Sequence, residues 1–366
     1  MTRPFMPGWK RAMARCLLVT GSLAMALLVA EGTVRTRQYV KYGTFHEIGG
    51  FRRADETTHL EVPVPGSATA TIRINSRGFR SPELDWTKPG GRIRIAFVGA
   101  STTFCAEVSS NEATWPYLVW RAMQEEHPEN GFDYLNAGIP GYTVANSLRN
   151  LERRVAPLAP DVIVLYEGFN DFIYSTQRLA SERGLYEKRR DIWSGRWSLA
   201  LDLVRKNYEI LVATWQMRRG ARPVLRFEPD EITGGFRADL TALVAASRRL
   251  APVVAIATLS HRIRRDQTAE EQLAASEAAL FYMPFLDPNG LVKGYEAYNR
   301  VIREIARSSG LILIEGEDTI PGDSAHFHDS VHFADAGSAL QAHRVILALD
   351  RSPAFVDLLK LKLTRI

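Results

Sequence analysis

Cysteine is scarce in this chain of 366 residues, which contains only Cys16 and Cys105. This scarcity excludes a scaffold stapled by several disulfides and a zinc ribbon built on thiolates. An excess of charge is missing too, because 46 basic and 41 acidic residues leave a net charge of +5. Without a basic patch interleaved with stacking aromatic side chains, we expect no nucleic-acid partner. The composition, 46% hydrophobic and 24% charged, is that of a globular protein with a sizeable core.

Long hydrophobic runs are absent except for one near the N-terminus, at 16–30, which carries no charge. With the apolar residues 12–14 it is near the lower limit for a membrane-spanning helix, which is about 17 residues. Basic residues precede it, which predicts a cytoplasmic N-terminus and an exported remainder, on the periplasmic or extracellular side. We therefore expect residues 1–35 to form a transmembrane anchor whose partner is the lipid bilayer. A cleaved signal peptide with its small-residue site at 24–26 and a buried helix of a cytosolic protein are the alternatives.

Residues 36–90 are polar and mixed, and we expect a linker followed by an N-terminal extension that packs on the main domain. The alternating residues 70–74 suit a strand, and residues 75–80 suit a turn. At the other end of the chain, we expect residues 353–366 to form a C-terminal tail.

From residue 91 a regular rhythm begins, in which short apolar runs alternate with stretches of helical spacing. The apolar runs lie at 92–99, 132–138, 161–168, 252–259 and 311–314. The helical stretches lie at 114–126, 144–157, 237–250 and 295–308. This alternation predicts βαβ units and a parallel sheet covered on both faces, hence one α/β domain over residues 91–352. In such sheets the ligand site lies outside the carboxyl ends of the strands.

Residues 172–236 interrupt this rhythm and form a predicted insertion rich in basic and aromatic residues. Within it, residues 198–219 have the spacing of an amphipathic helix. We consider two interpretations of this helix. It packs on the sheet, or it serves as a lid or a membrane-surface helix near the site.

Candidate site residues follow the ends of three predicted strands. Ser101 follows the first strand, where it caps a helix or, at a helix start with free backbone N–H groups, acts as a nucleophile. Gly138 follows the second strand, where it makes a turn or lets a substrate approach its N–H closely. Asn170 follows the third strand, where it closes an Asx turn or donates a hydrogen bond to a developing oxyanion.

A histidine-rich segment follows the last predicted strand, and it contains Asp329 and His332 three residues apart. If a tight loop holds this pair, the carboxylate bonds one imidazole nitrogen while the other nitrogen faces Ser101. Serine needs such a base because it is a weak nucleophile at its own pKa. Alternatively, His326, His328 and His332 ligate a metal ion together with Asp329. That alternative leaves the other strand-end residues unexplained, so we expect no metal at this site.

These blocks resemble the SGNH (GDSL-type) hydrolase superfamily. The resemblance covers about residues 91–350 and is carried by Gly-Ala-Ser-Thr-Thr around Ser101, Asn-Ala-Gly around Gly138, Gly-Phe-Asn-Asp around Asn170 and Asp-Ser-Val-His ending at His332. It implies a three-layer α/β/α sandwich with a mostly parallel, flavodoxin-like sheet. It also implies a triad of Ser101, His332 and Asp329, with an oxyanion hole from Ser101, Gly138 and Asn170. One departure is Ala100, which stands where many members carry an aspartate.

The sequence thus predicts an exported, membrane-tethered serine esterase that hydrolyses a small acyl ester by a Ser-His-Asp mechanism. An acetyl group on a glycan is one candidate substrate, and the mechanism needs neither a metal ion nor an organic cofactor. A polysaccharide O-acetyltransferase or deacetylase is a second hypothesis. A catalytically idle module that binds a glycan is a third.

Overall fold

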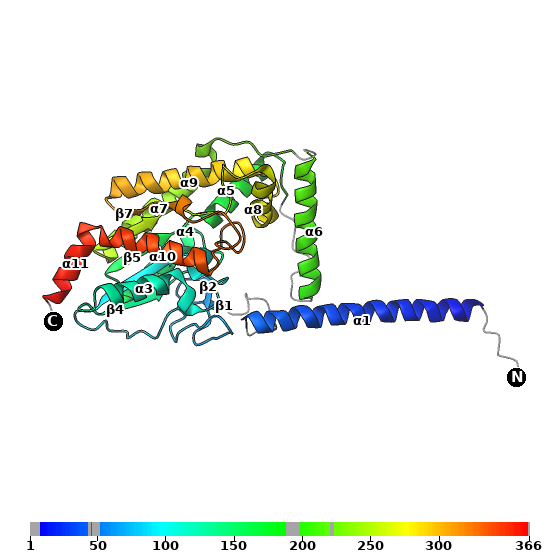
Figure 1. Cartoon of the computed structure of the whole chain (residues 1–366), viewed down its shortest axis with the longest axis horizontal. Coiled ribbons are helices and arrows are strands. Elements are labelled where there is room, and N and C mark those ends of the chain that lie inside the picture. Colours follow the sequence, from blue (N-terminus) through cyan, green and yellow to red (C-terminus); the bar gives the residue numbers. More distant parts are fainter. Residues whose placement is uncertain (1–7, 43–44, 46–51, 188–197, 220–222, 365–366) are drawn as a thin grey trace.

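The computed structural model of the chain describes residues 8–42, 45, 52–187, 198–219 and 223–364. Its centre is a five-stranded sheet, parallel throughout, with the strand order β4-β3-β5-β6-β7 (Figure 1). The strands are β3 (Ile93–Gly99), β4 (Phe132–Asn136), β5 (Val162–Tyr166), β6 (Val253–Ala257) and β7 (Ile312–Ile314). Every residue of β3, β5 and β6 is buried, because helices cover both faces of the sheet. This burial explains why the strands read as continuous apolar runs in the sequence.

Helices form a layer on each side of the sheet (Figure 1). One layer holds α3 (Trp115–Glu126), α10 (Asp335–Asp350) and α11 (Pro353–Leu363). The other holds α4 (Val144–Asn150), α5 (Phe169–Glu182), α7 (Pro229–Leu250) and α9 (Pro288–Ser309), with α8 (Ala269–Tyr282) beside α9. The predicted three-layer α/β/α sandwich is therefore confirmed.

Several predicted elements differ from the structure at their ends. The helix expected at 144–157 is α-helical only in α4 and continues as a π turn at Leu151–Val155 and a 3-10 turn at Ala156–Leu158. The residues expected as a C-terminal tail form α11, which buries Phe355 and Leu358 in the core. Both departures keep apolar side chains in contact with the sheet layer.

The N-terminal residues form one long helix, α1 (Gly8–Tyr42), which extends away from the sandwich (Figure 1). Within the described residues it is the one helix long and apolar enough to cross a membrane, and its apolar window has no residue buried inside the protein. The predicted anchor at 1–35 lies within this helix from residue 8 on, and residues 1–7 lie outside the described part. The expected linker therefore begins with a helical stretch, 36–42.

The extension that follows packs on the sandwich. It begins with an antiparallel hairpin of β1 (Arg52–Asp55) and β2 (Leu60–Pro63). The strand expected at 70–74 is wrong, because its only ladder contact is a single bridge between Ala68 and Arg73. The alternation there reflects burial instead, since Ile72 and Ile74 pack on a small cluster with Phe104. The turn expected at 75–80 is confirmed: the Asn75 side-chain oxygen accepts two backbone N–H groups, and Gly78 has a φ of +78°.

The expected insertion contributes its ends to the helix layer, because α5 runs to Glu182 and α7 begins at Pro229. Residues 188–197 and 220–222 of this insertion lie outside the described part. The helix expected at 198–219 is confirmed as α6 (Leu199–Arg218). The interpretation that it packs on the sheet is wrong, since its main packing partners are α8 and α1.

Candidate active site

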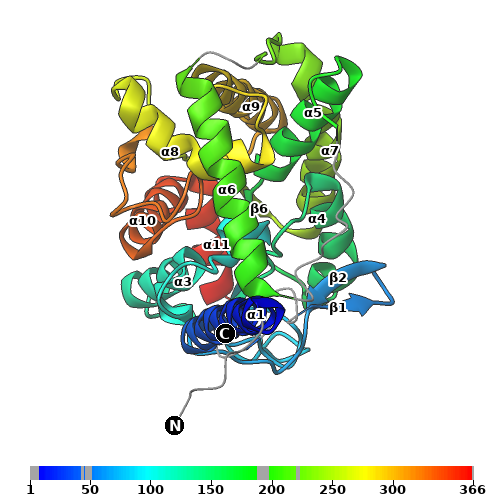
Figure 2. The same cartoon turned by 90° about the vertical axis from the view of Figure 1, so that its right-hand side faces the viewer.

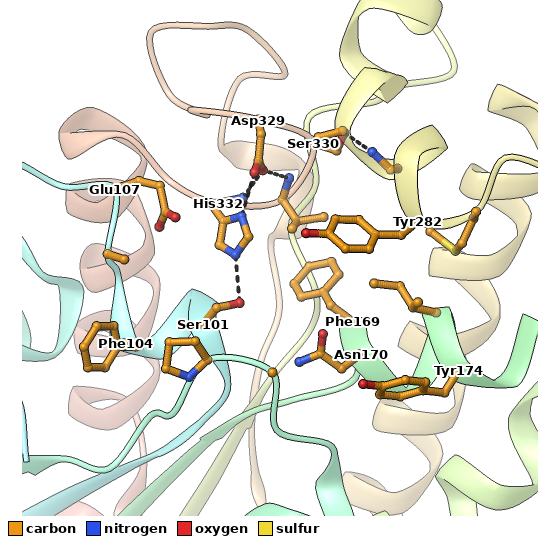
Figure 3. A pocket seen from close by; sticks show the side chains of 18 of the residues that line it. Ser101, Phe104, Glu107, Phe169, Asn170, Tyr174, Tyr282, Asp329, Ser330 and His332 are labelled. Carbon is orange, nitrogen blue, oxygen red and sulfur yellow. Dashed lines mark hydrogen bonds and ion pairs between the residues drawn. The ribbon is translucent and has the colours of Figure 1, made fainter. Parts of the chain in front are cut away.

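Three of the predicted site residues form a chain of hydrogen bonds at the carboxyl edge of the sheet (Figure 3). Ser101 is the first residue of the short helix α2 (Ser101–Phe104), which follows β3. Its Oγ lies 2.7 Å from His332 Nε2, although the two residues are 231 positions apart in the chain. The other imidazole nitrogen, Nδ1, lies 2.8 Å from Asp329 Oδ2. The arrangement has the geometry in which an imidazole takes a proton from a hydroxyl.

Hydrogen bonds to its own backbone N–H groups fix the conformation of the loop that carries Asp329 and His332. Asp329 Oδ1 accepts hydrogen bonds from the N–H groups of Val331 and His332, each at 2.9 Å. The loop closes where His328 N donates to His332 O over 2.8 Å, next to a bridge between the buried Phe327 and Phe333. Since one carboxylate oxygen holds the backbone and the other meets the imidazole, the ring orientation follows from the fold of the loop.

The charges around His332 favour its protonated form. Burial lowers the pKa of His332, but the nearby carboxylates of Glu107 and Asp329 outweigh burial and raise it to about 9. For Asp329, burial opposes ionisation, while the His332 charge and the hydrogen bonds to the carboxylate hold its pKa well below the ordinary value. Both pKa shifts favour the form of the pair in which His332 is protonated and Asp329 is ionised.

Glu107 is a site residue that the sequence reasoning missed. It follows α2, lines the same pocket, and lies beside His332 in Figure 3. Its Oε2 is buried and has no hydrogen-bond partner among the described residues. A single acidic residue after the apolar Phe104-Cys105-Ala106, six positions beyond Ser101, is the signal that points to it.

Position 138 requires glycine because the backbone after β4 passes very close to α2. A Cβ built there lies 2.5 Å from the backbone N of Phe104 and 2.9 Å from the carbonyl carbon of Thr103. The Gly138 N–H donates to Asn136 Oδ1 over 3.0 Å. Gly138 is buried and is not among the residues that line the pocket within the described chain. The structure thus places it behind the site and gives its N–H a partner there.

Asn170 lies on the pocket wall across from the imidazole (Figure 3). Its Nδ2 donates one hydrogen bond to Tyr142 O over 2.7 Å, and a side-chain amide carries two N–H bonds. The structure therefore brings Ser101, Asn170, Asp329 and His332 to one pocket.

The surroundings of Ala100, where the family resemblance leads us to expect an aspartate, suit a small apolar side chain. It is 5% exposed and packs with the buried Val62, Ile139 and Tyr142. Val62 belongs to β2 in the N-terminal extension. An aspartate here would bury its carboxylate among apolar side chains, which is costly without hydrogen-bond partners.

The pocket has a volume of about 680 Å³ and two kinds of wall. The polar wall carries Ser101, Glu107 and His332. Phe169, Tyr174 and Tyr282 lie across the pocket from the imidazole (Figure 3). Ile173, Tyr186 and Met283 add to the apolar and aromatic lining. Residues from α1 and the extension also line it, and sequence reasoning did not anticipate them: Arg37, Gln38, Arg52, Pro63, Ile72 and Ile74.

The metal alternative requires the three histidines to converge, and they do not. His326 Nδ1 lies 2.8 Å from Asp323 Oδ1, and His328 is exposed. Among the described residues, the ligand atoms of His326, His328, His332 and Asp329 do not assemble as three or more within 4.8 Å of one another. The histidines thus separate into one that faces Ser101 and two that lie elsewhere on the loop.

The family comparison, together with this parallel α/β sandwich, shows the class of the protein, an SGNH-type carboxylic ester hydrolase. The model of the GDSL-like lipase/acylhydrolase family matches residues 97–340, and the chain belongs to this family. The chain is similar to an acetylxylan esterase from Geobacillus stearothermophilus at 18% identity, with a TM-score of 0.43 over 72% of this chain and 96% of that one. It is also similar to the lipase/acylhydrolase from Enterococcus faecalis at 16% identity, with a TM-score of 0.42 over 70% and 95% of the two chains. The comparison with curated proteins gave no match.

Proposed function

We propose that this protein is an exported, membrane-tethered serine esterase that uses Ser101, His332 and Asp329 as its catalytic triad. The observation that carries the proposal is the continuous hydrogen-bond chain from Ser101 Oγ through the imidazole to the Asp329 carboxylate. Serine hydrolysis requires such a relay, because the hydroxyl must lose its proton as it attacks.

In the proposed reaction, Ser101 Oγ attacks the ester carbonyl carbon while His332 Nε2 takes the hydroxyl proton. His332 then gives this proton to the alkoxide of the leaving alcohol as the ester C–O bond breaks. A water molecule next attacks the acyl-serine, with its proton passing to His332 and then to Ser101 Oγ, so that the acid leaves and the serine is restored. Asp329 fixes the ring orientation and stabilises the imidazolium.

Three N–H groups are the proposed donors to the tetrahedral oxyanion. The Ser101 amide is at the first position of α2, where a backbone N–H has no partner within the helix. Asn170 has a second amide hydrogen beside the one that Tyr142 accepts. The Gly138 N–H would join them by leaving Asn136 Oδ1, which makes it the donor that depends on a local rearrangement.

The substrate class we propose is an ester of a small acyl group, with an acetylated glycan as the leading candidate. A pocket of about 680 Å³ is larger than an acetyl group needs and lies within the usual range for small-molecule sites, so it has room for the alcohol part. Transfer of the acyl group to a sugar hydroxyl instead of water is the second candidate reaction. Mass spectrometry of an acetylated oligosaccharide incubated with the protein separates hydrolysis from transfer.

The proposed location follows from the charges at the start of α1, ahead of its apolar run. Lys10, Arg11 and Arg15 precede the apolar run, which favours an N-terminus in the cytoplasm and a catalytic domain outside it. Accessibility of the domain to added protease in intact cells tests this orientation.

The triad is tested by hydrolysis of p-nitrophenyl acetate with the full-length protein in detergent. We expect Ser101→Ala to abolish turnover and labelling by a fluorophosphonate probe. Ser109→Ala is the matched control, because Ser109 is an exposed serine on the same segment. Equal turnover in Ser101→Ala and wild type would refute the assignment.

A further inference from the structure

Helix α6 carries a stripe of large apolar side chains that nothing in the described chain covers. The stripe residues are 49–66% exposed and comprise Leu201, Val204, Tyr208, Leu211 and Trp215. Their spacing of three and four residues places them on one side of the helix. The opposite side packs on the domain, where Ala213 is buried and Lys206 Nζ lies 5.4 Å from the ring centroid of Phe281 in α8. An outward apolar face of this kind marks an interaction surface.

The start of α6 is fastened to α1 at one residue, Glu31. The Glu31 carboxylate accepts hydrogen bonds from Ser198 Oγ at 2.7 Å, Leu199 N at 3.1 Å and Ala200 N at 2.9 Å. It also pairs with Arg35, one turn further along α1, at 2.7 Å. Glu31 is the first charged residue after the uncharged run 16–30. The fastening point therefore lies where the apolar part of α1 ends.

The direction of α6 relative to α1 follows from the two views. α6 runs crosswise to α1 in Figure 1, and Figure 2 shows α1 end-on below α6. The sandwich lies on one side of α6, and the apolar part of α1 extends past it on the other side (Figure 1). The stripe points away from the sandwich, toward the side that α1 would share with a bilayer.

We propose that the stripe of α6 lies in the interfacial layer of the bilayer that α1 crosses, with its apolar side chains in contact with lipid. The inference rests on the proposed membrane anchor and adds a second contact with the same membrane. A helix that starts at the polar boundary of a spanning segment and runs across it lies in the plane of the membrane surface. Amphipathic helices bind at this depth through their apolar face.

The composition of α6 fits this layer. Tyr208 and Trp215 are the residue types enriched at the headgroup level of membranes. Arg218 and Arg219 follow at the end of the helix, and the Arg219 guanidinium lies 4.5 Å from the Trp215 ring centroid. Basic side chains beside an apolar face favour anionic lipid. Continuity with the apolar surface of α1 favours a bilayer over a second copy of the chain.

The proposed contact of α6 with the bilayer also determines how far the pocket lies from the membrane surface. Arg37 and Gln38 line the acyl pocket, and they lie six and seven residues beyond Glu31 on α1. At 1.5 Å per helical residue this distance is about 9–10.5 Å along the axis. The pocket therefore opens close to the headgroup layer, where it would receive acyl esters presented at the membrane surface.

The test uses the full-length chain in vesicles of phosphatidylcholine with a minor part of phosphatidylglycerol. Single cysteines at Val204 or Tyr208, in a Cys16→Ser background, carry an environment-sensitive fluorophore, and lipids with a nitroxide near the top of the acyl chain act as quencher. Cys105 is buried and does not compete for the label. We expect a blue shift and quenching at both positions. Matched labels at Leu203, on another side of α6, and at Leu361, on α11, are expected to show neither.

Two further measurements keep the outcomes distinct. In the native sequence, a label on Cys16 reports whether α1 is in the bilayer. Quenching at Cys16 by a deep nitroxide, with none at Val204 or Tyr208, overturns the α6 contact and leaves the anchor standing. No quenching at Cys16 refutes the anchor itself. A blue shift that grows with the protein-to-lipid ratio, without quenching by lipid, places a second copy on the stripe and also overturns the proposal.

A charge-insertion variant checks that the stripe itself makes the contact. Val204→Asp combined with Leu211→Asp is expected to abolish quenching of a label at Tyr208 while leaving p-nitrophenyl acetate hydrolysis in detergent unchanged. The matched control, Leu361→Asp with Leu363→Asp, changes charge equally at exposed leucines of α11. Unchanged quenching in the α6 variant would refute the contact.

Discussion

Replacing Glu107 by glutamine is expected to make the enzyme faster at neutral pH, although it removes a carboxylate from the site. The proposed base, His332, must be neutral to accept the Ser101 proton. Glu107 and Asp329 raise the pKa of His332 to about 9, so most of the enzyme is protonated at pH 7. Glutamine keeps the shape of the side chain and removes its charge.

The size of the effect follows from the pKa of His332. With that pKa at about 9, only ~1% of the imidazole is neutral at pH 7. Removing a nearby opposite charge changes a pKa by about 1–3 units, so we take a fall of one unit as the minimum. The neutral fraction at pH 7 then rises about tenfold. A weaker base takes up the proton less readily, so we expect kcat/KM at pH 7 to rise roughly three- to tenfold.

The assay is the pH profile of kcat/KM for p-nitrophenyl acetate between pH 6 and pH 10. The wild-type profile is expected to rise with pH around a midpoint near pH 9, and the Glu107→Gln profile to have its midpoint at least about one pH unit lower. Glu112→Gln is the control, because Glu112 is an acid of the same segment whose partner is the exposed Arg73. A variant profile with an unchanged midpoint, or a lower rate at pH 7 in a protein of unchanged Tm, would refute the electrostatic reasoning.

Three substitutions test the surroundings of the site. Asn170→Ala should lower kcat by about 10²–10³-fold with little change in Tm, the loss typical of one oxyanion donor; an unchanged kcat contradicts that role. Arg80→Met should lower the free energy of unfolding by at least about 3 kcal/mol in urea titrations, because several buried carbonyls lose their donor. Ala100→Asp should lower it by at least about 2 kcal/mol, since its carboxylate enters an apolar cluster. For Arg80→Met and Ala100→Asp, the midpoint and slope of the urea transition give the change in the free energy of unfolding. An unchanged midpoint contradicts the packing described.

The sheet was predictable because its strands are buried on both faces and therefore appear as uninterrupted apolar runs. The residues 92–99 and 161–168, for example, contain β3 and β5 almost to the residue. The strand predicted at 70–74 was wrong because it rested on alternation instead. Ile72 and Ile74 are buried at every second position, which looks identical to a strand in the sequence. Burial of every second side chain needs a surface to pack on, whereas a strand needs a neighbour to pair with, and a single sequence does not distinguish them.

The site was predictable where chemistry restricts the residue type. A serine, an asparagine and an Asp-x-x-His pair after the first, third and last strands of the sheet indicate acyl transfer, and the structure brings their side chains together. Glu107 escaped because its effect depends on its distance from His332, and an acidic residue six positions beyond Ser101 does not by itself give that distance. The hydrogen bond from Gly138 N to Asn136 Oδ1 was not predicted either. The sequence analysis expected this N–H to face the oxyanion, whereas in the structure the side chain two residues earlier accepts it.

The N-terminal extension belongs to the catalytic unit, although the family match begins only at residue 97. The buried Arg80 guanidinium donates to the carbonyl oxygens of Phe104 and Cys105 at the end of α2, and to that of Thr71. Cys105 has a left-handed φ of +59°, a conformation that a non-glycine residue keeps only when its surroundings hold it. The loop that follows the proposed nucleophile is therefore shaped by residues that precede the recognised domain.

A chain that begins at residue 91 loses this clamp, and it also loses the Val62 contact with Ala100 and one wall of the pocket. We therefore expect it to lack esterase activity and to unfold at lower urea concentration. A chain that lacks only residues 1–30 keeps Glu31 and the pocket residues Arg37 and Gln38, so we expect it to retain activity and stability in detergent. Equal activity and stability of the two shortened chains would show that the extension only covers the sandwich. The expected difference follows because the carbonyls of α2 need a buried donor, and within the described chain Arg80 provides it.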